Sequence, residues 1–329
     1  MNLLVIKDRF GRPVLNLRIA INSECNLNCF FCHSEGEYPI LRCQKREEFR
    51  QLTAEQIVLV GKIAAEFGVN EIKITGGEPL LRRDITEIVS GLSSIPGIKE
   101  VSMVSNGILL EKYASSLKKA GLKRINVSLH SLDPKIYRKI TRTYYKNGPE
   151  IVISGIKKAL EVGLYPVKIN VVVLKDLNHH EIWDFIELSA DLGTPVQFIE
   201  YHEPKEVESK VFKNHYYPLL PLEKKLEKIA ERFIIRRMHG RKRFYLKNGA
   251  EVEIVRPMFN PEFCAKCTRL RVTSNGEFKP CLMRSDNHVD FYNAFSSEDP
   301  EEKLREYFLE AVQRREPYYK YPVEVELYG

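Results

Sequence analysis

The chain has 329 residues and a mass of 38.2 kDa, which suffices for one barrel-sized domain with an appendage or for two ordinary domains. Its 43% hydrophobic and 29% charged residues are typical of a soluble globular protein, and no apolar run reaches the roughly 20 residues that cross a bilayer. The net charge of +7 favours an anionic partner. Charges replace the apolar centre of a secretory signal near the N-terminus, so we expect a cytoplasmic protein that does not bind a membrane.

Charge and cysteine usage narrow the functional classes further. Basic residues are dispersed along the chain except in IIRRMHGRKRF at residues 234–244, and we interpret most of them as a solvated face. Seven cysteines in a chain without an export signal argue against a disulfide framework and favour metal binding or redox chemistry. Their positions therefore matter more than their number.

Short β-branched runs alternate with helical patterns through the first two hundred residues, which predicts repeated strand–helix units around a parallel sheet. The predicted strands are 16–22, 71–75, 101–106, 124–130, 167–173 and 196–201. The predicted helices between them are 53–67, 82–93, 110–120, 149–162 and 179–192. Several of these helices run into a glycine, as in EFGVN and KAGLK, which is typical of a left-handed C-terminal cap.

The pattern changes after residue 202. A helix is predicted over 222–232, followed by a hairpin in RFYLKNGAEVEIV that turns at Asn248-Gly249. A cysteine-containing segment occupies 264–281, and a last helix is predicted over 300–315. We therefore divide the chain into residues 1–202 and residues 203–329.

Three thiols gather in CNLNCFFC, directly after the first predicted strand, at Cys25, Cys29 and Cys32. Four thiolates saturate a tetrahedral zinc ion or give each iron of a [4Fe-4S] cluster one ligand. Three thiolates would leave one iron open to a ligand that is not protein. The alternative is a zinc site that takes its fourth ligand from a distance, such as His33 or Cys43.

A second motif, GGEP at residues 76–79, follows the second predicted strand. Two residues without Cβ allow the backbone to approach a ligand closely, and proline stiffens the exit from the turn. CxxxCxxC after one strand and GGEP after the next resemble the radical S-adenosylmethionine (radical SAM) enzymes. The resemblance implies that the open iron chelates the methionine part of S-adenosylmethionine, and that Glu78 accepts from its ammonium group.

The second trio is Cys264, Cys267 and Cys281, in FCAKCTRLRVTSNGEFKPCL. In isolation, a C-terminal CxxC indicates a structural zinc. The whole stretch, however, resembles the C-terminal cluster segment of MoaA-type GTP 3′,8-cyclases, the first enzymes of molybdenum-cofactor biosynthesis. The opening DRFGRPVLNLRIAINSECNLNCFFC is similar to their N-terminal segment, and the resemblance covers nearly the whole chain. It implies a second [4Fe-4S] cluster whose open iron coordinates the guanine base of GTP.

Polar residues recur on one face of four predicted strands, since residues two apart share a face. They are Arg18 and Asn22, Lys73 and Thr75, Asn126, Ser128 and His130, and Lys168 and Asn170. A packed barrel interior consists mostly of branched aliphatic residues. The pattern therefore predicts a wet cavity whose cations, with Arg269 and Arg271, receive a triphosphate.

The family resemblance assigns roles to individual residues. The positions expected to contact GTP are Arg18, Lys73, Ser105, Lys168, Arg269, Leu270 and Arg271. The positions expected to contact S-adenosylmethionine are Phe31, Gly76, Gly77, Glu78, Ser128 and His202. Arg271 is also the leading candidate for assisting the later chemical steps.

The chain departs from the family pattern at several of these positions. Lys73 stands where an arginine is usual, and Val104 where a threonine is usual, with Ser105 beside it as a substitute. Gln197 stands where an arginine is often found, and His202 where a methionine is usual. The chain ends in ELYG rather than Gly-Gly, and Cys43 is interpreted as an inert thiol.

These observations predict an α/β fold, an incomplete (β/α)6 TIM-type barrel with a C-terminal iron–sulfur cluster domain. The implied activity is that of a GTP 3′,8-cyclase with two [4Fe-4S] clusters and S-adenosylmethionine, which forms 3′,8-cyclo-7,8-dihydro-GTP through a 5′-deoxyadenosyl radical. The implied partners are GTP, an external electron donor and a downstream enzyme of the cyclic pyranopterin monophosphate synthase type. We expect a monomer or homodimer that does not bind nucleic acid.

Two other functions remain open from the sequence. One is a different radical SAM enzyme with an auxiliary cluster, acting on a peptide or another nucleotide. The departures at Val104 and Gln197 and the missing Gly-Gly favour it. The other is a zinc-containing nucleic-acid-binding protein, which only the positive charge and the CxxC motif support.

Overall fold

The structure of the chain is a computed structural model that describes residues 5–36, 50–203 and 210–320. Cys43 and the C-terminal ELYG lie outside the described residues. Six parallel strands form the centre of the fold. They are β1 (Asn16–Ala20), β2 (Glu71–Thr75), β3 (Glu100–Ser105), β4 (Arg124–Ser128), β5 (Val167–Val173) and β6 (Val196–Glu200). Four of the predicted strands run one or two residues too far at their C-terminal ends, to Asn22, Asn106, His130 and Tyr201.

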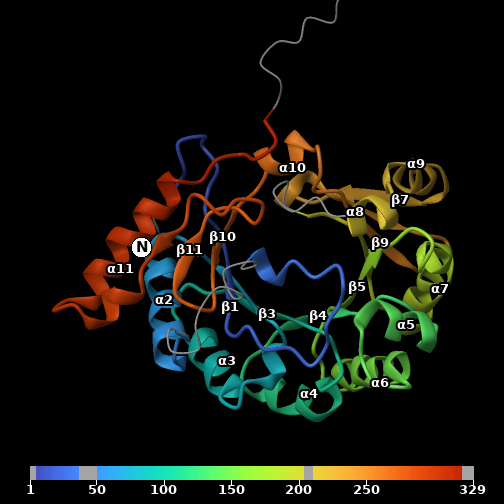
Figure 1. Ribbon diagram of the computed structural model, residues 1–329, viewed down its shortest axis with the longest axis horizontal. Coiled ribbons are helices and arrows are strands. Elements are labelled where there is room, and N and C mark those ends of the chain that lie inside the picture. The colour runs from blue at the N-terminus through green and yellow to red at the C-terminus, as the bar shows by residue number, and fades with distance from the viewer. Residues whose placement is uncertain (1–4, 37–49, 204–209, 321–329) are drawn as a thin grey trace, which may run out of the picture.

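Strands from the second half of the chain extend this sheet at both edges. β9 (Glu251–Val255) pairs parallel with β6, and β10 (Arg269–Val272) pairs parallel with β1. Beyond β9 lie the antiparallel strands β8 (Lys242–Tyr245) and β7 (Arg232–Ile235). Beyond β10 lie β11 (Glu277–Lys279) and β12 (Val289–Asp290). The strands curve into an open ring (Figure 1), which confirms the incomplete barrel.

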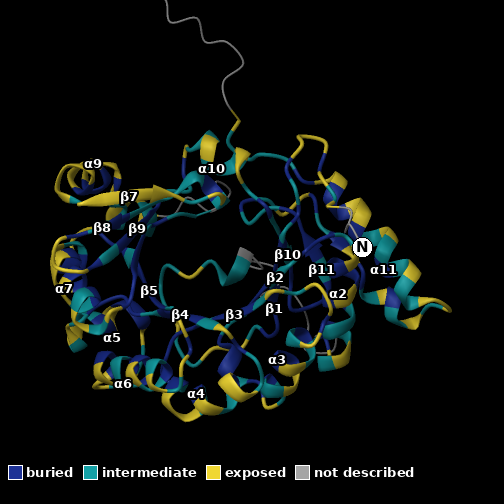
Figure 2. Ribbon diagram, turned by 180° about the vertical axis from the view of Figure 1, so that it is seen from behind, coloured by how far each residue is buried: buried dark blue, intermediate teal, exposed yellow. Residues whose placement is uncertain are grey.

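Helices cover the outside of the ring (Figures 1 and 2). They are α2 (Ala54–Glu66), α3 (Ile85–Ser93), α4 (Leu110–Lys119), α5 (Pro134–Thr141), α6 (Gly148–Glu161) and α7 (Ile182–Leu192). Local signals fix their ends: Thr53 and Gln56 form a capping box at the start of α2. Gly193 adopts a left-handed φ of 60° after α7, as the glycine pattern predicts.

Strand residues alternate between two environments. On β5, Val167, Ile169 and Val171 are buried in the core shared with the helices. The intervening Lys168 and Asn170 line a cavity inside the ring. Each fully buried branched side chain contributes about 1.5–3 kcal/mol, so the apolar outer face of the strands stabilises the ring. The inner face is left free to carry polar groups.

The C-terminal part supplies the remaining helices: α8 (Lys210–His215), α9 (Leu220–Ile229), α10 (Pro261–Ala265) and α11 (Pro300–Gln313). The helix predicted over 222–232 is wrong at its C-terminal end, because Ala230 is extended and Arg232 begins β7. The segment with α10 runs between the two extended edges of the sheet (Figure 1). The predicted hairpin is confirmed as β8 and β9, with Gly249 at a φ of 88° in the turn.

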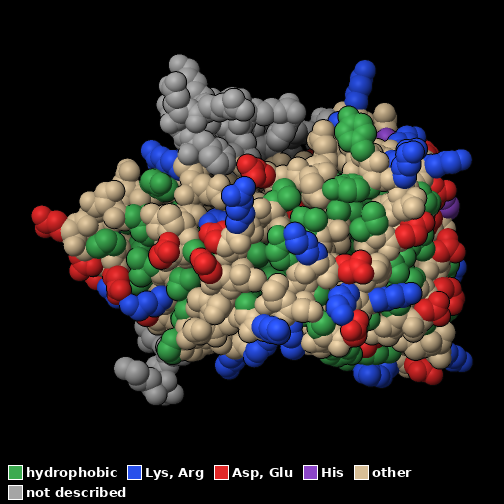
Figure 3. Space-filling view, turned by 90° about the horizontal axis from the view of Figure 1, so that it is seen from below, with side chains coloured by type: hydrophobic (Ala, Val, Ile, Leu, Met, Phe, Trp, Pro, Cys, Tyr) green, Lys and Arg blue, Asp and Glu red, His purple; other side chains and the backbone are tan. Residues whose placement is uncertain are grey.

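The surface agrees with a dispersed charge pattern. Figure 3 shows Lys and Arg interspersed with Asp and Glu on one face of the molecule, without a large area of a single sign. Among the residues that the structure describes, no helix has the length and apolar character needed to cross a membrane.

Candidate functional site

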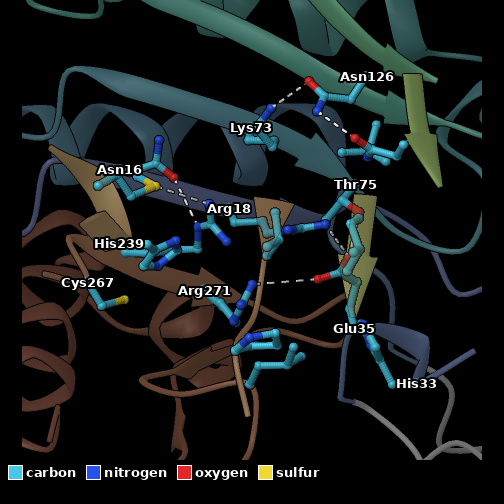
Figure 4. A pocket seen from close by; sticks show the side chains of 18 of the residues that line it. Asn16, Arg18, His33, Glu35, Lys73, Thr75, Asn126, His239, Cys267 and Arg271 are labelled. Carbon is cyan, nitrogen blue, oxygen red and sulfur yellow. Dashed lines mark hydrogen bonds and ion pairs between the residues drawn. The ribbon is translucent and has the colours of Figure 1, made fainter. Parts of the chain in front are cut away.

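The inside of the ring contains a cavity of about 700 Å³, within the range typical of small-molecule sites. Its wall includes residues of β1, β2, β4, β5, β6 and β10, and Figure 4 shows several of them pointing toward the same space. The predicted polar inner face is confirmed at all the positions named for it except Asn22. The amide of Asn22 instead donates to the carbonyl oxygen of Glu78, at 2.9 Å.

The first cysteine trio lies in the loop that follows β1, inside the ring. All three thiols are free and line the cavity. The loop is held by its own turn, in which Cys32 N–H donates to the carbonyl oxygen of Cys29 at 3.0 Å. Burial raises the pKa of Cys25 to about 11, so the thiol is neutral until a metal displaces its proton.

The two glycines of GGEP pack against the segment that leads into this loop. A Cβ on Gly77 would lie 2.1 Å from the carbonyl oxygen of Glu24, and one on Gly76 would lie 2.3 Å from Asn22 Oδ1. Backbone bonds from Gly77 to Asn22 (2.9 Å) and from Glu78 to Glu24 (2.7 Å) join the two segments. The glycines therefore allow two loops to approach each other and fix the position of Cys25, a role that the GGEP motif alone does not indicate.

The side chain of Glu78 does not line the cavity. Its carboxylate accepts from Leu80 N–H at 3.1 Å, Ser105 Oγ at 2.8 Å and Asn106 N–H at 2.7 Å. Burial raises its pKa to about 7, although these hydrogen bonds oppose the shift. Glu78 ties the ends of β2 and β3 together in this structure, and the Ser105 hydroxyl is engaged in that contact. The expected contacts of Glu78 with S-adenosylmethionine and of Ser105 with GTP stay predictions.

The second trio lines the same cavity from the C-terminal part of the chain. Cys264 lies in α10, and Cys267 and Cys281 flank the pair β10 and β11. The guanidinium of Arg12 donates to the carbonyl oxygen of Cys264 at 2.9 Å. The guanidinium of the buried Arg315 donates to the carbonyl oxygen of Cys267 at 2.8 Å. All three thiols are free. Across the described ranges, no three His, Cys, Asp or Glu side chains converge as they would around a single metal ion.

Three cations that line the cavity lie side by side on neighbouring strands. Register across β10, β1 and β2 pairs Arg271 with Arg18 and Arg18 with Lys73. Glu35, which no sequence motif singles out, follows the first trio. It contacts Arg18 at 2.7 Å, Thr75 at 2.8 Å and Arg271 at 3.7 Å (Figure 4). Burial alone would raise the pKa of Glu35, but the two arginines outweigh it and hold the pKa at about 2.

Lys73 and a fourth cation, Arg269, have neutral partners. Lys73 Nζ donates to Asn126 Oδ1 at 3.3 Å, and Arg269 Nε donates to Asn16 Oδ1 at 3.3 Å. Neither forms an ion pair with a carboxylate of the described residues. Burial, reinforced by neighbouring cations, holds the pKa of Lys73 well below its usual range. A buried cation without a counter-ion is costly, and an anion bound in this part of the cavity would reduce that cost.

Most other predicted residues line the cavity as expected. Phe31 packs edge-on against His130, with ring centres 4.9 Å apart, and the rings of His202 and His33 lie 5.3 Å apart. Burial lowers the pKa of His202, so its ring is neutral. Ser128 also faces the cavity. The exception is Leu270, whose side chain points the other way and is completely buried in the core.

The basic stretch at 234–244 is not simply a solvated face. Arg236 and Arg241 line the cavity, and both contact Glu253 of β9, at 2.8 and 3.5 Å. Lys168 contacts the same carboxylate at 2.8 Å. The sequence signal for Glu253 was the alternation in EVEIV, which places it on the face opposite Val252 but does not say that this face turns inward.

Comparisons with known proteins agree with this geometry. Residues 19–189 match the model of the radical SAM superfamily, and residues 194–321 match the molybdenum cofactor synthesis C family. The chain belongs to the radical SAM superfamily. A Thermococcus kodakarensis protein named "Probable GTP 3',8-cyclase" is 46% identical over 96% of this chain and 100% of its own length. One of the same name from Methanothermobacter thermautotrophicus is 44% identical over 95% and 99%.

A solved structure supports the fold alone. Streptococcus suis SuiB aligns with a TM-score of 0.61 at 20% identity, over 94% of this chain and 68% of its own. The predicted family and fold are therefore confirmed.

Proposed function

We propose that this chain is a GTP 3′,8-cyclase that converts GTP to 3′,8-cyclo-7,8-dihydro-GTP, the first step of molybdenum-cofactor biosynthesis. One observation carries the proposal: two trios of free thiols, more than two hundred residues apart in the sequence, line one cavity together with Lys73 and Arg269, which form no ion pair with a carboxylate of the described residues. The near full-length similarity to proteins named as probable GTP 3',8-cyclases supports the same substrate.

The residues present fit the cofactors that this function requires. Membership of the superfamily implies S-adenosylmethionine and a [4Fe-4S] cluster, and Cys25, Cys29 and Cys32 are the chain's candidates to hold that cluster. Thiolates are the usual ligands of iron–sulfur clusters, and these three are free on a loop that the glycine contacts fix. We assign Cys264, Cys267 and Cys281 to a second cluster on the same chemical grounds.

When bound, the first cluster and S-adenosylmethionine would supply the radical chemistry that starts at the ribose 3′ carbon. The chain's own residues bind and orient the reactants. Lys73 and Arg269, which form no ion pair with a carboxylate of the described residues, bind the negatively charged phosphate groups of GTP. Arg18 and Arg271, which both contact the Glu35 carboxylate, lie beside them as further contacts for the phosphates or the ribose. The surrounding sheet excludes water and limits which hydrogen the radical can reach.

Other parts of the function are proposals on the same basis. The boundary between a radical SAM part (1–202) and an auxiliary part (203–329) is supported by the change of family match between residues 189 and 194. An external electron donor and a downstream enzyme of the cyclic pyranopterin monophosphate synthase type are implied by the reaction. The monomer or homodimer prediction, the cytoplasmic location and the expected lack of nucleic-acid binding stay predictions.

An anaerobic assay tests the proposal. The reconstituted protein is incubated with GTP, S-adenosylmethionine and dithionite, and we expect the cyclised dihydro-GTP product together with 5′-deoxyadenosine. Cleavage of S-adenosylmethionine without any nucleotide product would instead favour another radical enzyme with an auxiliary cluster. Zinc without acid-labile sulfide in the purified protein would favour the zinc-containing alternative.

A further inference from the structure

A fully buried carboxylate on β9 organises four cations at one side of the cavity. Glu253 has no exposed surface, and it contacts Lys168 at 2.8 Å, Arg236 at 2.8 Å, Arg243 at 2.8 Å and Arg241 at 3.5 Å. Burial alone would raise its pKa, but Lys168 and the arginines hold it well below its usual range. Glu251 contacts only Arg243 of this group, at 3.3 Å. The group therefore keeps an excess of positive charge.

That excess faces the cavity rather than the solvent. Lys168, Arg236 and Arg241 line the cavity, whereas Arg243 does not. The Arg241 side chain is only 13% exposed, and its Nε is buried without a hydrogen-bond partner within the described structure. A guanidinium has five N–H donors, which suit phosphate oxygens. Arg241 thus brings a buried Nε donor that has no partner among the described residues to the wall of the cavity.

A continuous chain of amide side chains connects Arg241 to Lys73 across the sheet. Lys73 donates to Asn126 at 3.3 Å, and Asn126 donates to Asn170 at 3.2 Å. Gln197 donates to the same Asn170 oxygen at 3.2 Å and accepts from Arg241 at 3.0 Å. Two cations therefore stand at the ends of one hydrogen-bonded row on β2, β4, β5 and β6, and Figure 4 shows its Lys73–Asn126 end.

We propose that Arg241 is a substrate-positioning residue that binds the phosphate groups of the nucleotide, opposite Lys73. The inference rests on the proposed function. Glu253 holds the side chains of Arg241 and Lys168 in place. The phosphate oxygens accept hydrogen bonds from the N–H groups of Arg241 that neither Glu253 nor Gln197 engages. Because Arg241 and Gln197 share a hydrogen bond, a guanidinium at position 197 could reach the same space. The exchange of these two side chains is therefore a geometric test of the site.

The test measures anaerobic binding of GTP, GDP and GMP to the reconstituted holoprotein. In Arg241→Gln we expect GTP affinity to fall about 10- to 100-fold, the scale of a lost charge-assisted hydrogen bond. The loss should shrink from GTP to GDP to GMP as phosphates are removed. Arg243→Gln is the matched control, since Arg243 contacts the same carboxylate from outside the cavity lining, and it should keep the affinity of the wild type.

The double variant Gln197→Arg/Arg241→Gln places a guanidinium in the same space from β6. We expect it to recover most of the lost GTP affinity. Thermal melting and binding of S-adenosylmethionine by each variant report whether the fold is intact. Equal losses in Arg241→Gln and Arg243→Gln, or the same loss for all three nucleotides, would overturn the inference and leave the proposed function standing. A wild-type protein that does not bind GTP would overturn the proposed function as well.

Discussion

Gly77→Ala offers a direct test of how the fold positions the first cysteine trio. Gly77 does not require a left-handed backbone, so the change adds one methyl group and little else. Its Cβ would lie 2.1 Å from the Glu24 carbonyl oxygen and 2.6 Å from that of Ser23, whereas ordinary contact begins at 3.4 Å. The neighbouring atoms are backbone, so the loop itself must move by more than an ångström. Cys25 follows Glu24 directly and must move with it.

The cost of this displacement can be estimated from the contacts it disturbs. Overpacking costs about 1–3 kcal/mol, and the two backbone bonds that join the loops contribute about 1 kcal/mol each. We therefore expect the native loop arrangement to be destabilised by about 3–5 kcal/mol. With two clusters assigned, the wild type should hold about eight irons per chain and the variant about four.

Iron and acid-labile sulfide are counted after anaerobic reconstitution. Gly193→Ala is the control: its φ is 60° and nothing lies within 4 Å of the added methyl. It should lose about 1 kcal/mol of stability because of its left-handed backbone, with its full iron content. A Gly77→Ala protein with the iron content and S-adenosylmethionine cleavage of the wild type would refute this reasoning.

Two other predictions concern charge in the cavity. Glu35→Gln removes the carboxylate that competes with an anionic ligand for Arg18 and Arg271, so GTP affinity should rise about fivefold, as for an ion pair of about 1 kcal/mol. A titration at fixed ionic strength measures it against the surface variant Glu66→Gln, and weaker binding would contradict it. Burial lowers the pKa of Lys168 to about 7, so Lys168 loses its charge as pH rises through 7. GTP affinity should then fall between pH 6 and 8, by at most about tenfold per unit for one linked proton. Lys168→Arg stays charged and should remove this fall; an identical pH profile in both proteins would show that another group is responsible.

Local patterns predicted the strands and the cysteine motifs well. Alternation along β5 separates Val167 and Ile169 from Lys168 and Asn170, and the structure places the two sets on opposite faces as expected. The same reasoning located Arg18 and Lys73. These features depend only on neighbours in the sequence, and period two is a strong signal when one face must pack against helices.

Local sequence patterns do not predict contacts between distant segments. The parallel pairing of β9 with β6 turns Glu253 inward, and nothing in EVEIV specifies this partner. Glu35 meets Arg271 only because β10 lies beside β1. The glycines of GGEP were interpreted through ligand approach, whereas their closest neighbours are Asn22 and Glu24. α5 was missed although Asp133-Pro134 carries the cap that starts it.

In the proposed function, one cavity holds GTP where a radical can reach its ribose. GTP that carries deuterium at the ribose 3′ carbon tests this in a single anaerobic turnover with S-adenosylmethionine and dithionite. We predict that 5′-deoxyadenosine recovered from the reaction contains one deuterium and that the nucleotide product has lost it. Unlabelled 5′-deoxyadenosine beside fully deuterated nucleotide would contradict the claim.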